Sequence, residues 1–425
     1  MTMKERSMAM KARGAKEKGI SRREFIKSTA AVAAVATVGS LGFPNILRGA
    51  APEILIGHIH PLSGPLAFDG QEMKKAVMWG IREINDAGGI KSLGGAKLKL
   101  IDADSEGKPE KSISEVERLD RAGVVAITGC YQSAVAIVAT QISEKVGIPF
   151  VVGVASANEI TARGFKFTFR VQPPSVTFSE NTLKYLAAIA ESAGVNVKTI
   201  AYLHENTQFG TTLADDVEKM APQYGMNVIS RVSYSTKAAD YSTEVGKIKA
   251  AGADLIFTSG YFGDGVRVVR TLNDLRVKAK AIVGVASGGL SHPKFVAELG
   301  DMTEGVMDCN YFYNPRSARA KKTLDGFKAA FGGDMSPSMV FGYQTVPVIA
   351  DAIERAKSTN REAIRKALTE TNFTNHILPQ GPIVFGADGQ NKNASAVLMQ
   401  VTNKNIEVVW PKDYATGKVG FPRQG

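Results

Sequence analysis

Short runs of β-branched and aliphatic residues recur along this 425-residue chain and alternate with longer stretches of helical periodicity. The runs have the length of buried strands, and the stretches gather their apolar residues on one helix face. The predicted strands are 54–56, 98–101, 124–127, 149–152, 200–203, 255–257 and 281–283, and the predicted helices lie near 71–85, 109–120, 133–146, 209–224 and 265–275. Strands that alternate with crossover helices form parallel sheets covered on both faces.

The alternating pattern occurs twice, once before Arg170 and once after Val197. This repetition predicts an α/β fold with two doubly wound parallel-sheet lobes. The order then changes to helices near 320–331, 340–357 and 361–369 and strands near 383–385, 396–401 and 406–409. A separate domain of this make-up would bury a poor core, so we expect the segment to complete both lobes. Several chain crossings at one edge would form a hinge.

The formal net charge of +11 is concentrated at the N-terminus. Residues 1–51 hold 10 Lys and Arg against 3 Asp and Glu, which leaves 42 against 38 in the rest of the chain. Binding to nucleic acid needs basic side chains gathered on one face. The mixed charges of the remainder therefore argue against a nucleic-acid partner.

Segment 1–51 is typical of an export signal. The pair Arg22 and Arg23 precedes a weakly apolar run over 28–43, which is too short to span a bilayer. These features resemble a twin-arginine signal, and the small residues Gly49-Ala50-Ala51 place cleavage after Ala51 or, almost equally well, after Ala50. A basic helix on the membrane surface is the alternative, but the run has no polar face. We therefore expect an exported, periplasmic protein.

The two cysteines after this segment, Cys130 and Cys309, are too few and too far apart for a disulfide framework or a metal motif. We expect them to be two separate buried thiols.

Motifs of common α/β enzymes do not occur in the sequence. The first predicted strand leads into the turn 61–65 instead of a GxGxxG loop, and there is no Walker loop, HExxH or GxSxG motif. His58 and His60 share one face of a strand, but no third metal ligand is evident, so a structural role is expected. We predict no catalytic residue, no metal and no cofactor.

Two predicted strands end in turns that carry hydroxyl groups. Ser133 opens a helix after the strand 124–127, and Ser156 follows the strand 149–152. Ligands of open parallel sheets bind at the carboxyl ends of strands, where helix N-termini offer unpaired N–H groups. These turns are therefore candidates for holding an anion, although Ser133 could equally be an ordinary helix cap.

From about Ile54 to Val409 the sequence resembles the periplasmic leucine/isoleucine/valine-binding proteins, the solute receptors of branched-chain amino acid ABC importers. The similarity is carried by Pro61-Leu62-Ser63-Gly64-Pro65, Asn85-Asp86-Ala87-Gly88-Gly89-Ile90, Asp102-Ala103-Asp104, the turn that contains Ser133, and Glu159-Ile160-Thr161-Ala162-Arg163-Gly164. It implies a type I periplasmic binding protein, a monomer whose two lobes close over a small ligand and present it to a membrane permease.

The resemblance also implies lobe boundaries and binding positions. After the signal peptide 1–51, lobe 1 would comprise residues 52–172 and 307–386, and lobe 2 residues 173–306 and 387–425, joined by three crossings. Ser133 and Ser156 match hydroxyls that hold the ligand carboxylate, and Val154 matches a backbone carbonyl that meets the ligand ammonium. The aromatic positions of the pocket fall on Phe209, on Tyr261 in the second lobe and on Tyr343 near the cleft rim.

Two positions depart from the family pattern. Ala286 stands where the family has an acidic partner for the ligand ammonium, and Asp69 stands where an aromatic residue is common. If Asp69 supplies the missing carboxylate, the expected ligand is an apolar or branched-chain amino acid. An exposed Asp69 would favour an aromatic or aliphatic acid without the amine. An α/β enzyme and a ligand-sensing module that docks a signalling partner are the alternatives from other classes.

Overall fold

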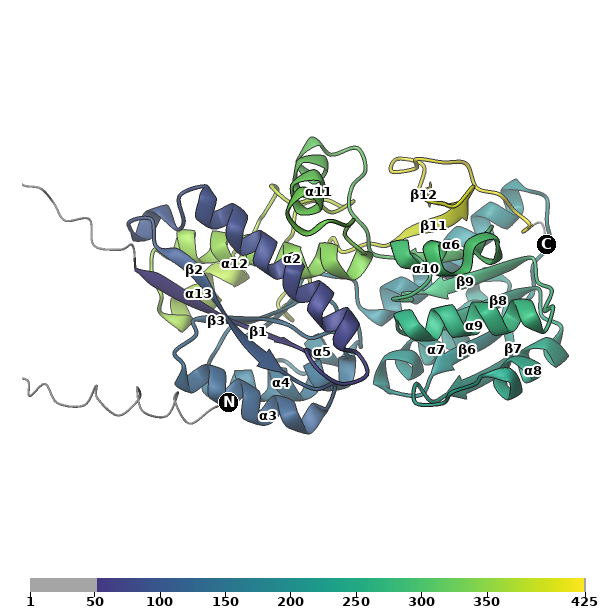
Figure 1. The fold of residues 1–425 in the computed structure, drawn as a ribbon, viewed down its shortest axis with the longest axis horizontal. Coiled ribbons are helices and arrows are strands. Elements are labelled where there is room, and N and C mark those ends of the chain that lie inside the picture. Colours follow the sequence, from purple (N-terminus) through teal and green to yellow (C-terminus); the bar gives the residue numbers. More distant parts are fainter. Residues whose placement is uncertain (1–51, 424–425) are drawn as a thin grey trace, which may run out of the picture. The chain divides into compact units, whose positions relative to one another are not determined.

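Two open sheets of mostly parallel strands carry the fold (Figure 1). The computed structural model describes residues 52–423, so the expected signal peptide, with Arg22, Arg23 and its cleavage site, lies outside the described residues. All described residues belong to one compact unit. Within the described part, none of the helices has the length and apolar character that crossing a membrane requires.

The first sheet has five parallel strands in the order β2-β1-β3-β4-β5. Its strands are β1 (Glu53–His60), β2 (Lys97–Asp104), β3 (Ala126–Gly129), β4 (Phe150–Val152) and β5 (Thr168–Arg170). One buried cluster joins a face of the sheet to α2 (Ala67–Asp86), α12 (Pro337–Ala356) and α13 (Arg361–Thr369). A second cluster joins the other face to α3 (Pro109–Arg121), α4 (Ser133–Val146) and α5 (Glu159–Ala162). Parallel strands need this cover on both faces.

The second sheet has seven strands in the order β12-β11-β10-β9-β8-β6-β7. Five of these strands are parallel to one another: β6 (Thr199–Glu205), β7 (Asn227–Tyr234), β8 (Leu255–Ser259), β9 (Ala281–Val285) and β10 (Met307–Asn310). The other two, β11 (Val397–Thr402) and β12 (Asn405–Trp410), form an antiparallel edge. Its covering helices are α6 (Ser175–Ser192) and α7 (Gln208–Met220) in one buried cluster, and α8 (Ser242–Ala251), α9 (Phe262–Asp274) and α10 (Pro293–Leu299) in another. Helix α11 (Ala318–Phe331) contacts α2. Short 3₁₀ turns lie at Lys91–Leu93, Ala221–Tyr224 and Gly300–Thr303.

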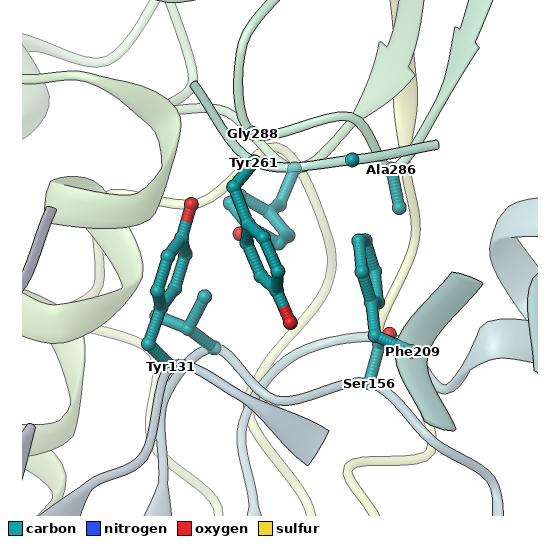
Figure 2. Close-up of a pocket in the computed structure, with 9 residues that line it drawn as sticks. Tyr131, Ser156, Phe209, Tyr261, Ala286 and Gly288 are labelled. Atoms are coloured by element: carbon teal, nitrogen blue, oxygen red, sulfur yellow. The ribbon is translucent and has the colours of Figure 1, made fainter. Parts of the chain in front are cut away.

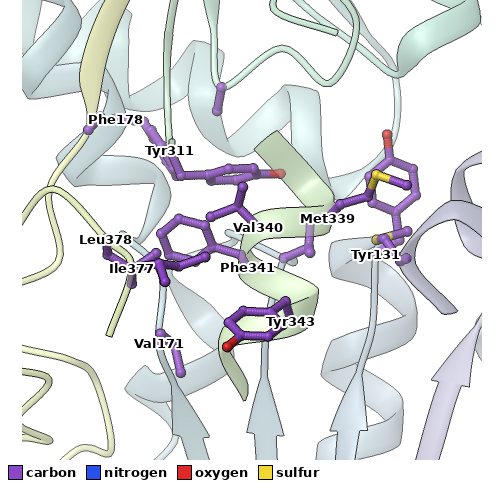
Figure 3. Close-up of a cluster of buried hydrophobic side chains, with 14 of the residues drawn as sticks. Tyr131, Val171, Phe178, Tyr311, Met339, Val340, Phe341, Tyr343, Ile377 and Leu378 are labelled. Carbon is purple, nitrogen blue, oxygen red and sulfur yellow. The ribbon is translucent and has the colours of Figure 1, made fainter. Parts of the chain in front are cut away.

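The chain passes between the two sheets three times: after β5, after β10 and after α13. Figure 3 shows that side chains from these crossings surround the start of α12 in a shared apolar cluster. The ring of Tyr311, just after β10, packs against Phe178 and Phe341 with centroid separations of 5.7 and 4.8 Å. The crossings are therefore buried in a common core.

The α/β class and the two-lobed arrangement are confirmed, and the segment after residue 319 contributes to both lobes as expected. Cys130 and Cys309 are both free and buried, also as expected. The strand predicted near 383–385 is wrong, because only isolated bridges form there. The sequence pattern did not predict three of the strands, β5, β7 and β10, or four of the helices, α5, α6, α8 and α10.

Two parts of the expected lobe boundaries need correction. Residues 307–310 were expected in lobe 1, but they form β10, which pairs with β9 and β11 in the second sheet. Residues from 387 onward were expected in lobe 2, but Gln390 bridges to Arg170 at the end of β5, and Asn391 bridges to Phe385. Hydrogen-bonded pairing therefore places 307–310 in the second lobe and keeps residues 390–391 with the first.

The two histidines of β1 lie side by side in the interior of the first lobe. The rings of His58 and His60 are 4.7 Å apart, which agrees with their predicted common face. The Nδ1 atom of His58 is 3.3 Å from Oδ1 of Asp102, whereas within residues 52–423 neither ring nitrogen of His60 has a hydrogen-bond partner. Burial lowers the pKa of His58 and lowers that of His60 further. In the same range, no group of three or more potential metal-ligating side chains is found.

We expect His60→Leu to make the protein less sensitive to mild acid. Because burial lowers the folded-state pKa of His60, only the unfolded state takes up this proton as the pH falls below about 6.5. Below that pH the wild type loses up to about 1.4 kcal/mol of unfolding free energy per pH unit at this site, and the variant does not. Urea denaturation at pH 7.5 and 5.5 measures the difference.

The comparison must be made between the two proteins and not on the wild type alone. Burial raises the pKa of Asp69 and of Asp308 to about 7, and these groups stabilise the fold as the pH falls. Both proteins share that contribution, so it cancels in the difference. Equal pH dependence in wild type and variant would contradict a buried neutral His60.

Candidate functional site

A pocket lies where the carboxyl ends of strands from both sheets meet (Figure 2). Its walls lie close together and enclose only about 10 Å³, about the room for one water molecule, so the lobes must separate to admit a solute. Every wall residue lies shortly after a strand: the strands are β3 and β4 of the first sheet and β6, β8, β9 and β10 of the second. The lining residues are Tyr131, Val154, Ser156, Phe209, Gly260, Tyr261, Ala286, Gly288 and Tyr311.

The first lobe contributes the turn after β4 and the turn after β3. The Ser156 hydroxyl accepts a hydrogen bond from the Ser175 hydroxyl at 3.2 Å, and its own hydrogen makes no hydrogen bond within residues 52–423. The carbonyl of Val154 accepts a hydrogen bond from the Gln172 side chain. This wall therefore offers the pocket a hydroxyl donor, while the backbone carbonyl beside it is already engaged.

A buried guanidinium lies behind the Ser156 turn. Arg170, at the end of β5, is fully buried and donates to the carbonyl of Ala157 at 2.6 Å, to the hydroxyl of Thr161 at 3.1 Å and to the Gln390 side chain at 2.6 Å. No carboxylate among residues 52–423 lies within 4.0 Å of it, and burial lowers its pKa to about 9. The turn that carries Ser156 is thus held by a positive charge without an ionic partner.

Aromatic rings form the facing wall from the second lobe. The Tyr261 ring lies between those of Tyr131 and Phe209, with centroid separations of 5.1 and 5.6 Å (Figure 2). Tyr261 is only 4% exposed, yet within the described part of the chain its hydroxyl makes no hydrogen bond of acceptable length and angle, although the nearby Thr207 hydroxyl acts on its pKa. Burial raises its pKa well above the ordinary range of tyrosine, so the hydroxyl keeps its proton and can donate it in a hydrogen bond.

The turn after β9 approaches the first lobe closely. Ala286 has a φ of 52°, in the left-handed region that is uncommon for a residue with a side chain. At Gly288 a Cβ atom would lie 2.6 Å from the Tyr131 hydroxyl, so only glycine lets this turn meet the ring across the pocket.

Three buried carboxylates, those of Glu205, Asp264 and Asp308, lie behind the second-lobe wall, and each accepts hydrogen bonds from donors of its own lobe. Burial raises the pKa of all three, to about 7 for Asp308. Their donors include the backbone N–H groups of Thr207 and Gly210 for Glu205 (2.7 and 2.6 Å), the Tyr241 hydroxyl and Arg267 for Asp264 (2.9 and 2.8 Å), and the Ser287 N–H and Asn310 amide for Asp308 (3.2 and 3.1 Å).

Five of the eight residues selected from the sequence line the pocket, and three do not. The five are Val154, Ser156, Phe209, Tyr261 and Ala286. Ser133 is buried in the first turn of α4, where its hydroxyl accepts the Ala157 N–H at 3.1 Å. Tyr343 lies inside α12, and its hydroxyl binds Glu83 and the Arg319 guanidinium. Asp69 accepts the Tyr131 hydroxyl at 3.2 Å, which orients that ring from behind.

Four lining residues were not selected from the sequence: Tyr131, Gly260, Gly288 and Tyr311. Tyr131 lies in the same turn as Ser133, so the turn was found but the wrong side chain was chosen within it. Gly260 and Gly288 follow predicted strands and could have been found by position alone. Tyr311 follows β10, a strand that was not predicted, and therefore gave no signal.

Contacts at the rim also connect the two lobes. The Asn158 side chain, next to the Ser156 turn, donates to Asp216 of α7 at 2.8 Å. The Phe68 ring of α2 packs against Phe262 of α9 with a centroid separation of 5.3 Å. Together with the Tyr131–Tyr261 pair, these contacts enclose the pocket between the lobes.

Comparison with known proteins supports a family assignment for nearly the whole chain. The sequence profile of the family described as "Periplasmic binding protein" matches residues 53–405, and that of the twin-arginine translocation signal matches residues 19–39. Leu/Ile/Val-binding protein homolog 8 of Brucella abortus is 27% identical over 397 residues, which cover 91% of this chain and 98% of the relative. Homolog 7 of Brucella suis is 28% identical, with 90% and 98% covered.

Solved structures share the fold. The leucine-binding protein LivK of Thermotoga maritima superposes with a TM-score of 0.71 at 20% identity, covering 84% of this chain and 97% of its own. LivJ of Streptococcus pneumoniae, a branched-chain amino acid transporter substrate-binding protein solved with isoleucine, gives a TM-score of 0.72 at 21% identity, with 87% and 100% covered. The twin-arginine match indicates export, and the chain belongs to the periplasmic binding protein family.

Proposed function

We propose that this protein is the extracytoplasmic receptor of an ABC importer, which binds a small carboxylate solute between its lobes and delivers it to a membrane permease. The observation that carries the proposal is the shared pocket, in which Tyr131 of the first lobe faces Tyr261 of the second. A ligand held by both walls stabilises the closed arrangement selectively, which is what a receptor that closes on its solute requires.

The chemistry of the walls supports a solute with a carboxylate and an apolar body. The Ser156 and Tyr261 hydroxyls are available donors, Arg170 supplies positive charge behind the Ser156 turn, and aromatic rings surround the remaining space. The relatives named for leucine, isoleucine and valine support an apolar or branched-chain amino acid as the ligand. The alternative is an aromatic or aliphatic acid, which also has a carboxylate and an apolar body.

Capture without turnover fits the pocket better than catalysis. Its lining side chains include no histidine, cysteine, lysine or carboxylate. Ser156 has a serine as its hydroxyl neighbour and therefore no base that would activate it as a nucleophile.

Saturation with a carboxylate ligand is expected to close the lobes. A thermal-shift panel of small carboxylates selects the ligand, because a compound that binds only the folded state raises the melting temperature. Small-angle X-ray scattering should then show a smaller radius of gyration at saturation. An unchanged scattering profile with a ligand that demonstrably binds would contradict the receptor proposal.

The two serines selected from the sequence should respond differently to replacement by alanine. Ser156→Ala removes a pocket donor, so the affinity for the carboxylate should fall by about 1–3 kcal/mol, with little change in folding. Ser133→Ala leaves the buried Ala157 N–H unpaired and should lower the unfolding free energy by about 1–3 kcal/mol. Calorimetric titration and urea denaturation of both variants separate the effects. Unchanged affinity in Ser156→Ala would show that the carboxylate binds elsewhere.

A further inference from the structure

We infer that the ligand is a carboxylic acid without a free ammonium group, so that the pocket discriminates against amino acids of the same shape. This inference rests on the proposed function and narrows its ligand class. It follows from the polar groups of the pocket: no carboxylate lines it, three nearby carbonyls already accept a hydrogen bond, and two hydroxyls can donate to a carboxylate.

Three backbone carbonyls near the pocket each accept a hydrogen bond within the protein. The Val154 carbonyl, which the resemblance assigned to the ligand ammonium, accepts from the Gln172 side chain. The Gly260 carbonyl on the opposite wall accepts the Gly288 N–H at 3.0 Å. The carbonyl of Ser156 accepts the Ser175 N–H at 2.8 Å. An ammonium would have to share these oxygens with donors that hold the turns in place.

No carboxylate reaches the pocket to replace those carbonyls. Ala286 presents a methyl group at the wall, and the lining residues contain no Asp or Glu. The three carboxylates behind the second-lobe wall are satisfied by their own donors. Asp69, the sequence-based candidate for this role, is separated from the pocket by Tyr131, whose hydroxyl it accepts. A buried ammonium without such a partner is strongly unfavourable.

Two hydroxyls at the pocket can donate to a carboxylate. The Tyr261 hydroxyl is 4% exposed and points into the pocket (Figure 2), and among residues 52–423 it makes no hydrogen bond of acceptable length and angle, although the nearby Thr207 hydroxyl acts on its pKa. The Ser175 hydroxyl, which has one hydrogen, lies 3.1 Å from the Ser156 carbonyl and 3.2 Å from the Ser156 hydroxyl, so Ser156 need not use its own hydrogen in this contact. One hydroxyl from each wall can therefore donate to a bound carboxylate.

Charged groups lie behind both walls. Arg170 bonds to the carbonyl of Ala157, directly after Ser156, and Asp388, although beyond ion-pair distance, is the carboxylate that acts on its charge. The three carboxylates behind the second-lobe wall are buried, and burial raises the pKa of each, which favours their neutral forms. Charges of both signs are therefore present, and the preference for a carboxylate rests on the hydroxyl donors and on the lack of an Asp or Glu at the pocket wall.

Matched ligand pairs test the inference on the wild-type protein. The pairs are 4-methylpentanoate with L-leucine and 3-phenylpropanoate with L-phenylalanine, whose members differ only in the amine. Isothermal titration calorimetry should give the amine-free acid at least about tenfold higher affinity in whichever pair binds, because the amino acid leaves its ammonium unpaired.

A variant at the pocket wall provides the reverse test. Ala286→Glu adds the missing carboxylate on a backbone that already carries a Cβ at φ 52°, and Ala286→Gln is the uncharged control of equal size. The Glu variant should gain at least about tenfold in affinity for the amino acid relative to the amine-free acid, and the Gln variant should not. Circular dichroism checks that both variants fold.

The outcomes distinguish this inference from the function on which it rests. Equal or tighter binding of the amino acids by the wild type would overturn the inference and leave the receptor proposal intact. Failure of every acid and amino acid to bind at millimolar concentration would overturn the small-carboxylate ligand itself, and the inference with it. If Ala286→Gln changes the preference as much as Ala286→Glu does, side-chain size and not charge sets the preference, which also overturns the inference.

Discussion

The buried charge of Arg170 is the constraint on which the binding site depends. Burying a guanidinium without an ionic partner costs on the order of several kcal/mol, and its hydrogen bonds to neutral acceptors recover only part of that. In return, these bonds fix the turn after β4 that carries Ser156. Asp388 lies beyond ion-pair distance but acts on this charge, so one buried side chain positions the hydroxyl that faces the pocket without lining the pocket itself.

The parallel-sheet architecture explains why one pocket needs two lobes. The carboxyl ends of the strands in each sheet provide only one wall: a hydroxyl turn from the first sheet, and aromatic and glycine turns from the second. The three crossings share a continuous apolar core around Tyr311 and Phe341. The covalent and packing connections thus lie together at the crossings, while contacts such as Asn158–Asp216 at the rim are single polar interactions that can break and reform.

Periodicity predicted the strand–helix alternation because buried parallel strands are short, continuous apolar runs. It missed β7, whose residues alternate between exposed and less exposed at the sheet edge, and β10, whose Asp308 and Asn310 are polar yet buried. Apart from the turn after β10, the turns that line the pocket were predicted correctly because each follows a predicted strand. Which side chain of a turn faces the pocket could not be predicted in this way. Ser133 turns back to accept the Ala157 N–H, and Tyr131 takes the place at the wall. Such choices depend on tertiary contacts that a single sequence does not contain.

A carboxylate held between the hydroxyls of the two lobes would be seen most directly in a crystal structure of the complex with the tightest-binding acid. The informative distances run from the carboxylate oxygens to Ser156 Oγ and to the Tyr261 hydroxyl. We expect both distances to fall within hydrogen-bonding range, about 2.5–3.0 Å, with the apolar body of the ligand against Phe209. A carboxylate that points away from both hydroxyls, toward solvent or another part of the cleft, would contradict this expectation.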